Sequence, residues 1–510
     1  MTSPHAAASP RAGLREWVGL AVLVMPILVV SMDMSVLYLA LPSLTVDLQP
    51  SSAEQLWILD IYSFMLAGLL VTMGSLGDRI GTRRLLMIGS VVFGVASVLA
   101  AFSQNPESLI ASRVLLGIGG ATLAPSTLSL LRKLFVDPVQ RGMAVGVWTA
   151  GFAGGGSFGP VVAGFLLEHF WWGSVFLINL PIMALLLVAA PLILPEAKNP
   201  DPGRFDLLAV AGSIVTMLAL VFALKHTAQD GVDWQAGAAL VVAAVVGTWF
   251  VRRQRASTHP IIDFPLFRNP AFSVAVIVIL VSVFVIAGFN LLLSQFLQLV
   301  MGFSTLEAGL WSLIPAVATA VASLTAPFVM KRRHPSVILL GSICVAAVGA
   351  AVVGLVGLPG SVTTGAALAV LLCGMVIASL GVGTGTTLGS DRVLATAAPE
   401  KAGAAGAVSE TGAELGGALG IAVLGSINLA TYRLALGGDV PPDSTLAGVL
   451  SDPTTGPAVA DRAREAYVDG MVAAAGATVG MMVVAGLVSA YLFRRAARTA
   501  AAEPERLPAA

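Results

Sequence analysis

The sequence has few charged residues. Of its 510 residues, 11% are Asp, Glu, Lys or Arg, whereas 57% are hydrophobic. Soluble domains carry about a quarter charged residues, and a mean hydropathy of +0.90 over so long a chain does not fit one buried core. The bilayer accepts apolar surface all round a helix, so we expect a polytopic membrane protein. The formal net charge is zero, which gives nucleic acid no electrostatic reason to bind.

Metal ligands, nucleophile constellations and phosphate-binding loops are also scarce. The two cysteines, Cys344 and Cys373, have no His or Cys neighbour at ligand spacing, so neither a disulfide framework nor a zinc site is expected. The five histidines lie outside the centres of the apolar runs, which argues against an intramembrane enzyme. No P-loop occurs, and this disfavours direct use of ATP. We therefore expect neither an enzyme nor a resident cofactor.

Long apolar runs are abundant. A helix needs about 20 apolar residues to cross the hydrocarbon layer, and this length predicts fourteen spanning helices. The expected ranges are 17–42, 55–76, 84–103, 107–131, 142–167, 171–194, 207–226, 235–252, 271–300, 305–330, 336–357, 362–387, 403–430 and 468–493.

Basic residues favour one side of the membrane. Fourteen spans place both termini on the same side, and that side holds 23 of the 28 Lys and Arg residues. The opposite side holds four, and Arg113 falls within a span. Because basic loops stay in the cytoplasm, we place both termini there. These are a short N-terminus, residues 1–16, and a tail, residues 496–510, that we expect to be disordered.

One loop on the outer side, residues 431–467, is long. It contains four prolines and mixed charges. Either it carries one or two short amphipathic helices that cap the outer side, or it is an ordinary solvated loop.

Five ionisable residues fall inside expected spans. They are Asp33, Asp60, Arg113, Glu410 and Glu414. A charge at the bilayer centre costs about 2.5–3.5 kcal/mol on insertion scales, so each such residue is a candidate functional group. A carboxyl group placed there can take up a proton on one side of the membrane and release it on the other.

Two alternatives compete with a functional role for these acids. Glu410 and Glu414 are four residues apart and share one helix face, where two carboxylates titrate as a coupled pair. Either of them could instead lie at the cytoplasmic end and be solvated. Asp33 could form a structural ion pair with Arg113, which would not exclude a part in coupling.

Aromatic residues stand near these charges. Trp57, Tyr62 and Trp148 could offer ring faces to an organic cation, with a carboxylate as the counter-charge. The alternative for each ring taken singly is packing, or anchoring at the membrane interface.

Glycines recur at intervals of four in two expected spans. Gly151, Gly155 and Gly159 precede Pro160 in the fifth span, and Gly412, Gly416 and Gly420 occupy the thirteenth, a spacing that lets helices approach closely.

The segment Gly74–Arg84 resembles the signature loop between helices 2 and 3 of the major facilitator superfamily. In that family the acidic and basic residues of the loop latch the two halves of the protein in the outward-facing state. The resemblance implies that Asp78, Arg79 and Arg83 are gate residues that do not touch substrate.

Two further segments resemble motifs of the same superfamily. Residues 112–119 are similar to its span-4 motif, which implies a part in proton coupling for Arg113. Residues 155–164 are similar to the span-5 antiporter motif, a mark of export, and imply a conformational role for Gly155, Gly159 and Pro160. Ala163 departs from this motif, in which Gly is usual.

Over nearly its whole length the chain resembles the 14-helix drug:proton antiporters of that superfamily. The runs that carry this likeness are residues 56–63, 146–148, 172–179 and 409–416. The resemblance implies an all-α major facilitator fold, with six-helix bundles at 17–194 and 271–495 and a linker, 195–270, that holds two extra helices. It also implies a monomer that exports quaternary ammonium compounds, dyes and viologens in exchange for protons, through Asp33, Asp60, Glu410 and Glu414.

An alternative keeps the fold and changes the cargo. The chain could export one specific antibiotic or metabolite. Four acids against a single Arg inside the spans argue against an anionic cargo.

Overall fold

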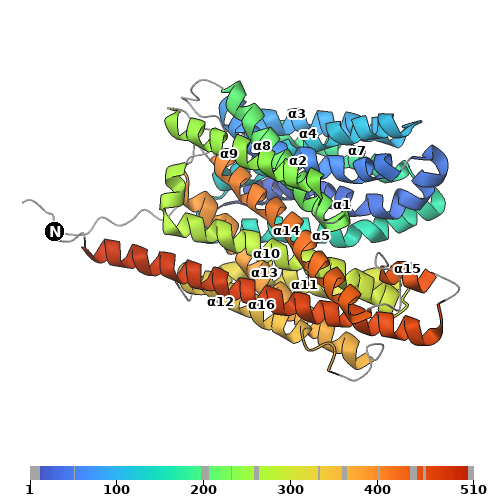
Figure 1. Cartoon of the computed structure of the whole chain (residues 1–510). Coiled ribbons are helices and arrows are strands. Elements are labelled where there is room, and N and C mark those ends of the chain that lie inside the picture. Colours follow the sequence, from blue (N-terminus) through green and yellow to red (C-terminus); the bar gives the residue numbers. More distant parts are fainter. Residues whose placement is uncertain are drawn as a thin grey trace, which may run out of the picture. The chain divides into compact units, whose positions relative to one another are not determined.

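The computed structural model is built of helices throughout the parts of the chain that it describes (Figure 1). The described residues are 12–50, 52–196, 206–230, 233–257, 264–330, 334–358, 365–398, 402–436, 445–451 and 455–502. Helices satisfy every backbone hydrogen bond within the segment itself, which a bilayer requires.

The chain divides into two compact units, and the first contains the N-terminal helices. These are α1 (Leu14–Leu48), α2 (Ser52–Ile80), α3 (Thr82–Ala101), α4 (Pro106–Leu134), α5 (Pro138–His169), α6 (Ser174–Leu177) and α7 (Asn179–Ile193). Within this unit α1 packs on α5, while α2 and α3 both pack on α4. The unit also includes residues 324–331 and 397–408, which are the end of α11 and the beginning of α14.

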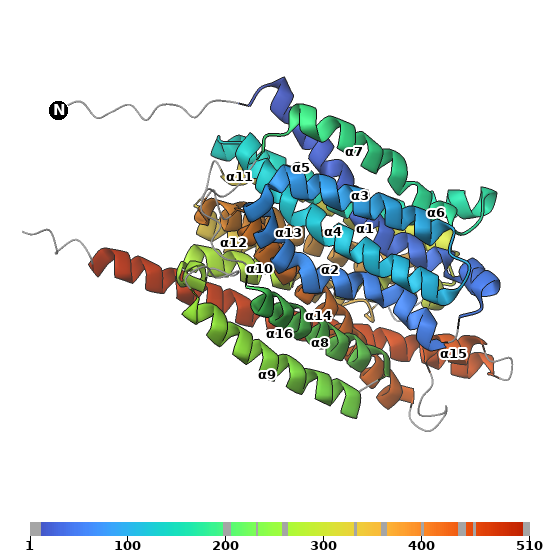
Figure 2. The ribbon, with the colours of Figure 1, turned by 90° about the horizontal axis from the view of Figure 1, so that it is seen from above.

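The second unit contains the remaining helices. These are α8 (Leu207–Asp230), α9 (Trp234–Ala256), α10 (Pro270–Gln295), α11 (Thr305–Met330), α12 (Pro335–Val353), α13 (Gly365–Thr396), α14 (Ala402–Leu436), α15 (Leu446–Ser451) and α16 (Pro457–Ala502), with short turns η1 (Phe264–Arg268) and η2 (Phe296–Val300). Here α12 packs on α13 and α16, and α10 packs on α13. Helices α8 and α9 form a pair of their own, seen side by side in Figure 2.

Each expected span falls on a helix of the structure. In the described residues, twelve helices are long and apolar enough to cross a membrane, and α5 makes thirteen when its two arms count as one span. The expected span at 207–226 corresponds to α8, whose apolar part, Leu208–Ala223, is shorter. The all-α class is thus confirmed, while the number fourteen and the side of the termini stay predictions.

Several helix starts follow directly from the sequence. Proline suits the first turn of a helix, where its missing N–H costs nothing, and a polar side chain just before it accepts a hydrogen bond from the next free amide. Four helices begin in this way, with the pairs Asn105–Pro106, Asp137–Pro138, Asn269–Pro270 and His334–Pro335.

The glycine repeats lie where helices approach most closely. On α5, a Cβ added to Gly155 would collide with the backbone oxygen of Leu28 on α1. On α14, a Cβ added to Gly416 or Gly420 would collide with the backbone oxygen of Leu280 or Phe284 on α10. The fifth helix of each expected bundle therefore packs backbone to backbone against the first helix of that bundle.

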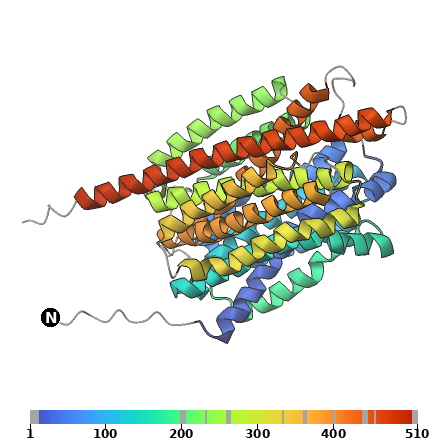
Figure 3. The ribbon, with the colours of Figure 1, turned by 90° about the horizontal axis from the view of Figure 1, so that it is seen from below.

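In its described residues, 445–451, the segment between α14 and α16 forms the short helix α15, and a cap over the outer side stays a prediction. Helix α15 packs on α16 and on η2. Helix α16 begins at Pro457, before the expected span, and continues to Ala502 (Figure 3). Residues 496–502 of the expected tail thus continue α16, and disorder of the tail stays a prediction.

We expect Gly416→Ala to destabilise the protein by about 1–3 kcal/mol, the usual cost of overpacking. The adjacent Gly417 is the matched control, because an added Cβ there would make only ordinary contacts, 3.7 Å from Val283 Cγ1 and 3.9 Å from Ala287 Cβ. Thermal unfolding in detergent measures both variants. A Gly416→Ala variant as stable as Gly417→Ala would contradict the close approach of α10 and α14.

Candidate functional site: a buried ion pair, an acid pair and a capped gate

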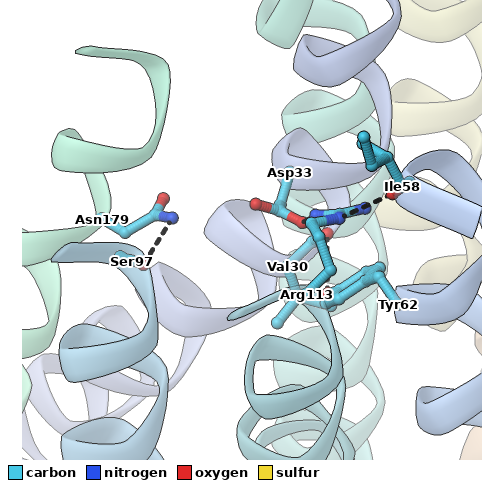
Figure 4. A network of polar contacts seen from close by, with 7 residues as sticks. All are labelled: Val30, Asp33, Ile58, Tyr62, Ser97, Arg113 and Asn179. Carbon is cyan, nitrogen blue, oxygen red and sulfur yellow. Dashed lines mark hydrogen bonds and ion pairs between the residues drawn. The ribbon is translucent and has the colours of Figure 1, made fainter. Parts of the chain in front are cut away.

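The candidate site begins with an ion pair between α1 and α4 (Figure 4). Arg113 Nη1 lies 2.5 Å from Asp33 Oδ2, and the two side chains are 1% and 3% exposed. The Arg113 Nε–H donates to the carbonyl oxygen of Ile58 on α2 at 3.2 Å. The guanidinium also lies over the ring of Tyr62, 4.6 Å from its centroid. One arginine thus binds groups from α1 and α2 at once.

Small residues on α4 bring α2 close enough for these contacts. A Cβ on Gly117 would lie 2.5 Å from Met65 Cβ and 2.9 Å from the Tyr62 carbonyl oxygen. A Cβ on Gly120 would lie 3.2 Å from the Tyr62 hydroxyl. The span-4 motif therefore supplies both the charge and the glycines that let α2 reach it.

A buried ion pair of this kind is stable only while both partners are present. Removing one charge leaves the other uncompensated in a medium of low dielectric constant. The ion pair between Asp33 and Arg113, one of the alternatives that the sequence allowed for Asp33, is thus present in the structure.

The second pair of ionisable residues lies on α14. Glu410 is buried, with 9% of its surface exposed, and Glu414 is half-buried one turn later. Glu410 is therefore not a solvated surface residue, while the solvated alternative stays open for the half-buried Glu414. Ser409, beside Glu410, approaches Ser390 of α13 at 3.4 Å between hydroxyl oxygens. Two carboxylates one helical turn apart exchange protons as a coupled pair.

The aromatic residues do not all face open space. Tyr62 is fully buried and its ring face is occupied by Arg113. Trp148 is buried as well, stacks on Phe152 and donates its indole N–H to Thr127 Oγ1 at 3.0 Å. Trp57 is 44% exposed. Packing therefore accounts for Tyr62 and Trp148, and Trp57 is the ring that remains available.

Asp60 lies in α2, between Trp57 and Tyr62. Its side chain is outside the described part of the chain. Its place in the candidate site stays a prediction.

Asp78, in the last turn of α2, caps a helix that begins more than 300 residues away in the sequence. The Asp78 carboxylate accepts hydrogen bonds from the backbone N–H groups of Gly403 and Ala404, both at 3.0 Å. These amides belong to the first turn of α14, where a helix has no internal acceptors to offer. Gly403 packs closely here, since an added Cβ would lie 2.5 Å from Asp78 Oδ1 and 2.7 Å from the Gly74 carbonyl oxygen.

The basic residues of the loop have a different partner. Arg83 Nη1–H donates to the Leu194 carbonyl oxygen at 3.0 Å, and its Nε lies 3.6 Å from a carboxylate oxygen of Glu196. Arg84 reaches the same carboxylate at 3.8 Å. Arg79 is half-buried next to Asp78. The sequence did not single out Glu196. Its position directly after the last apolar residues of α7 was the signal that could have identified it.

The span-5 motif residues lie at a bend in α5. The arms Pro138–Gly156 and Val161–His169 meet at 40°. Gly155 lies against α1 on one side of the bend. Gly159 is buried within the bend, and the side chain of Pro160 is outside the described residues. At the start of the same helix, a Cβ on Gly142 would lie 3.5 Å from Pro327 Cβ of α11.

No cluster of metal ligands accompanies these residues. Among the residues that the structure describes, no three His, Cys, Asp or Glu side chains are placed to hold a metal ion.

We expect Arg113→Gln to lower the stability of the protein by about 3–5 kcal/mol, because it leaves the Asp33 carboxylate buried without its partner. The double variant Asp33→Asn/Arg113→Gln should regain part of that loss, since no uncompensated charge remains. Thermal unfolding of the two single variants and the double variant measures the coupling. Strictly additive losses would contradict a direct ion pair.

We expect Asp78→Ala to open the first turn of α14. The loss of about 1–2 kcal/mol of hydrogen bonding raises the population of an open arrangement about 5- to 30-fold. The labelling rate of an Ala405→Cys probe by a maleimide reports this opening, because Ala405 is 1% exposed.

The probe requires a background in which Cys344 and Cys373 are replaced, because both native thiols are exposed. Asp78→Asn keeps one carbonyl acceptor and should give an intermediate rate. Equal labelling of all three proteins would show that Asp78 does not hold α14.

Comparison with known proteins supplies the family. The model of the Major Facilitator Superfamily matches residues 24–421. The chain is 41% identical over 500 residues to the multidrug efflux pump LfrA of Mycolicibacterium smegmatis, covering 95% of this chain and 98% of that protein. It is 34% identical to the methyl viologen resistance protein SmvA of Salmonella typhimurium, covering 89% and 93%.

Two further relatives extend the comparison. The tetracenomycin C resistance and export protein of Streptomyces glaucescens is 30% identical and covers 92% of this chain and 86% of its own. The crystal structure of the human organic anion transporter MFSD10 (TETRAN) has a TM-score of 0.61 at 14% identity, covers 93% of this chain and 99% of its own, and shows the same fold. The chain therefore belongs to the major facilitator superfamily and is a multi-pass transport protein of the bacterial inner membrane.

Proposed function

We propose that the protein is a proton-coupled multidrug antiporter that exports organic cations by alternating access. The observation that carries this proposal is the uneven charge of the buried groups. Arg113 neutralises Asp33 in the first unit, so the excess of acid inside the spans lies at Glu410 and Glu414 on α14, together with Asp60 on α2. Four acids stand against one Arg inside the expected spans, and this excess of negative charge favours a cationic cargo.

The acid pair and the gate share one helix, and this supports coupling between them. Asp78 binds the amides of Gly403 and Ala404, and Glu410 follows about two turns later, roughly 10 Å along the helix at a rise of about 1.5 Å per residue. A change in charge at Glu410 acts on the same rigid element whose first turn Asp78 holds. Cargo and protons can thereby bias the equilibrium between two states of the gate.

The mechanism is competition between protons and cargo for the same carboxylates. In the outward-facing state, protonation removes the negative charge that holds the organic cation, and the cation leaves. In the inward-facing state, release of the proton restores the anion that binds the next cation. Rocking of the two bundles about a site near the midplane would carry both ligands across.

The number of protons decides which gradient drives export. One proton against one monovalent cation moves no net charge and uses the pH gradient alone. Each additional proton adds about 2.3 kcal/mol per 100 mV of membrane potential. Two carboxylates on α14 and Asp60 on α2 provide room for more than one.

The relatives support an organic cation as cargo. LfrA is a multidrug efflux pump, and SmvA confers resistance to methyl viologen, which is an organic dication. We extend the same class, with quaternary ammonium compounds and cationic dyes, to this chain.

A second candidate is export of one specific antibiotic. It is favoured by the likeness to a tetracenomycin C resistance and export protein over 92% of this chain. The two proposals differ in breadth, since a specific exporter protects cells from one compound and a multidrug pump protects them from several unrelated cations.

Efflux of ethidium from energised cells tests the proposal. We expect Glu410→Gln and Asp60→Asn to lower the initial rate at least tenfold, because each removes a negative charge that would attract the cation. Glu465→Gln is the matched control, since Glu465 lies exposed in the first turns of α16. Expression is matched by immunoblot.

Wild-type efflux rates from both acid variants would refute charge capture. Wild-type cells that export one antibiotic and none of several organic cations would favour the specific exporter.

A further inference from the structure

Helix α9 presents two faces of different character. Its buried residues include Ala236, Ala243 and Phe250, spaced seven apart. On another face Val241, Val245 and Trp249 follow one another at intervals of four and are 62%, 64% and 42% exposed. The second face is an apolar stripe, a ridge that winds gradually round the helix and ends on a tryptophan.

The ring of Trp249 is held in a notch of the neighbouring helix. A Cβ added to Gly212 of α8 would lie 2.5 Å from Trp249 Cζ3, so the ring occupies the space that a larger residue would fill. Thr216, one turn later on α8, packs against Gly247 in the same way, with 3.0 Å between Cγ2 and an added Cβ. Helices α8 and α9 are closest at these glycines, and the indole is fixed there.

Arginine continues the stripe where the apolar residues end. Arg253, four residues after Trp249, places its guanidinium 5.7 Å from the centre of the indole ring, within the range of a cation–π contact. Arg252 and Arg255 lie exposed beside it. The sequence of α9 contains no acidic residue. The last turns of α9 therefore carry three positive charges at the end of an exposed apolar stripe.

The length of this surface matches one leaflet of a membrane. Val241 and Arg253 are twelve residues apart, which is about 18 Å at a rise of about 1.5 Å per residue. Half of the hydrocarbon layer is about 15 Å thick. An acyl chain laid along the stripe would bring its phosphate to the level of the arginines.

We propose that the surface formed by Val241, Val245, Trp249, Arg252 and Arg253 binds an anionic phospholipid. The acyl chain lies along Val241 and Val245 and against the edge of Trp249. The phosphate binds Arg252 and Arg253, since guanidinium groups bind phosphate oxygens in a fork-like geometry. Clusters of basic residues at the end of a spanning helix attract anionic headgroups in this way.

The bound lipid would hold the α8–α9 pair in place. The strongest packing of α9 is with α8. A lipid bound to this surface would contact the ring of Trp249, which packs against Gly212 of α8, and the arginines of α9. It would thereby add to the contacts between the two helices.

The test uses the full-length protein in detergent, with phosphatidylglycerol or phosphatidylcholine added. We expect phosphatidylglycerol to raise the unfolding temperature of the wild type by several degrees more than phosphatidylcholine does. Arg252→Gln/Arg253→Gln should lose at least half of that difference. Trp249→Leu, which keeps an apolar side chain, should lose part of it. Arg433→Gln is the control, because Arg433 is an exposed arginine in the last turn of α14, and it should keep the whole difference.

Two results would overturn the proposal. One is a full phosphatidylglycerol effect in the Arg252→Gln/Arg253→Gln variant. The other is an equal effect of soluble glycerol phosphate on the wild type, which would show that the arginines bind free phosphate without the acyl chain. Counting bound phosphatidylglycerol by native mass spectrometry gives a second measure, with at least one molecule fewer expected on the double variant.

Discussion

The buried ion pair between Asp33 and Arg113 is the interaction on which the candidate site depends. Either charge alone would be uncompensated where water cannot reach it, so α1 and α4 must meet where these residues lie. The same guanidinium binds the Ile58 carbonyl and covers Tyr62, which fixes α2 as well. Because Arg113 neutralises Asp33, the remaining acids inside the expected spans are Asp60 on α2 and Glu410 and Glu414 on α14. This distribution of charge is the reason for proposing that Glu410 and Glu414 bind protons and organic cations.

A second constraint lies in how the first turns of α14 and α5 are capped. The capping residue comes from another helix for α14 and is the adjoining residue for α5. The first turn of α14 has its amides capped by Asp78 from another helix. The first turn of α5 is capped by its own Asp137, and Gly142 near this turn lies against Pro327 and Met330 of α11. Separation of Asp78 from α14 would therefore uncover the amides of Gly403 and Ala404, whereas the first amides of α5 would keep Asp137 as their acceptor. Helix α14, whose first turn would lose these hydrogen bonds on exposure, also carries the acid pair Glu410 and Glu414.

Much of the fold was predictable, because the length of an apolar run determines whether a helix can span the bilayer. The Asn–Pro and Asp–Pro pairs before α4, α5 and α10 marked their starts as well. The polar first turns of α16 carried no such signal, and neither did the bend in α5. In the site, sequence identified Asp33, Arg113 and Asp78 as special. It did not show that Asp78 binds Gly403 or that Arg83 binds Glu196, because each contact joins helices more than 100 residues apart. The burial of Tyr62 and Trp148 could not be predicted from the sequence either. Aromatic rings suit both a cation site and a packed core, and the structure shows both rings in packed surroundings.

The central claim is that protons and organic cations compete for one set of buried carboxylates. The most direct measurement is proton release on cargo binding, made with purified wild-type protein in weakly buffered detergent solution near neutral pH. Addition of a saturating organic cation such as tetraphenylphosphonium is predicted to release at least one proton per bound cation, followed with a pH indicator, and to release fewer as the starting pH rises and the carboxylates lose their protons beforehand. Binding of the cation with no release of protons at any pH would contradict the account.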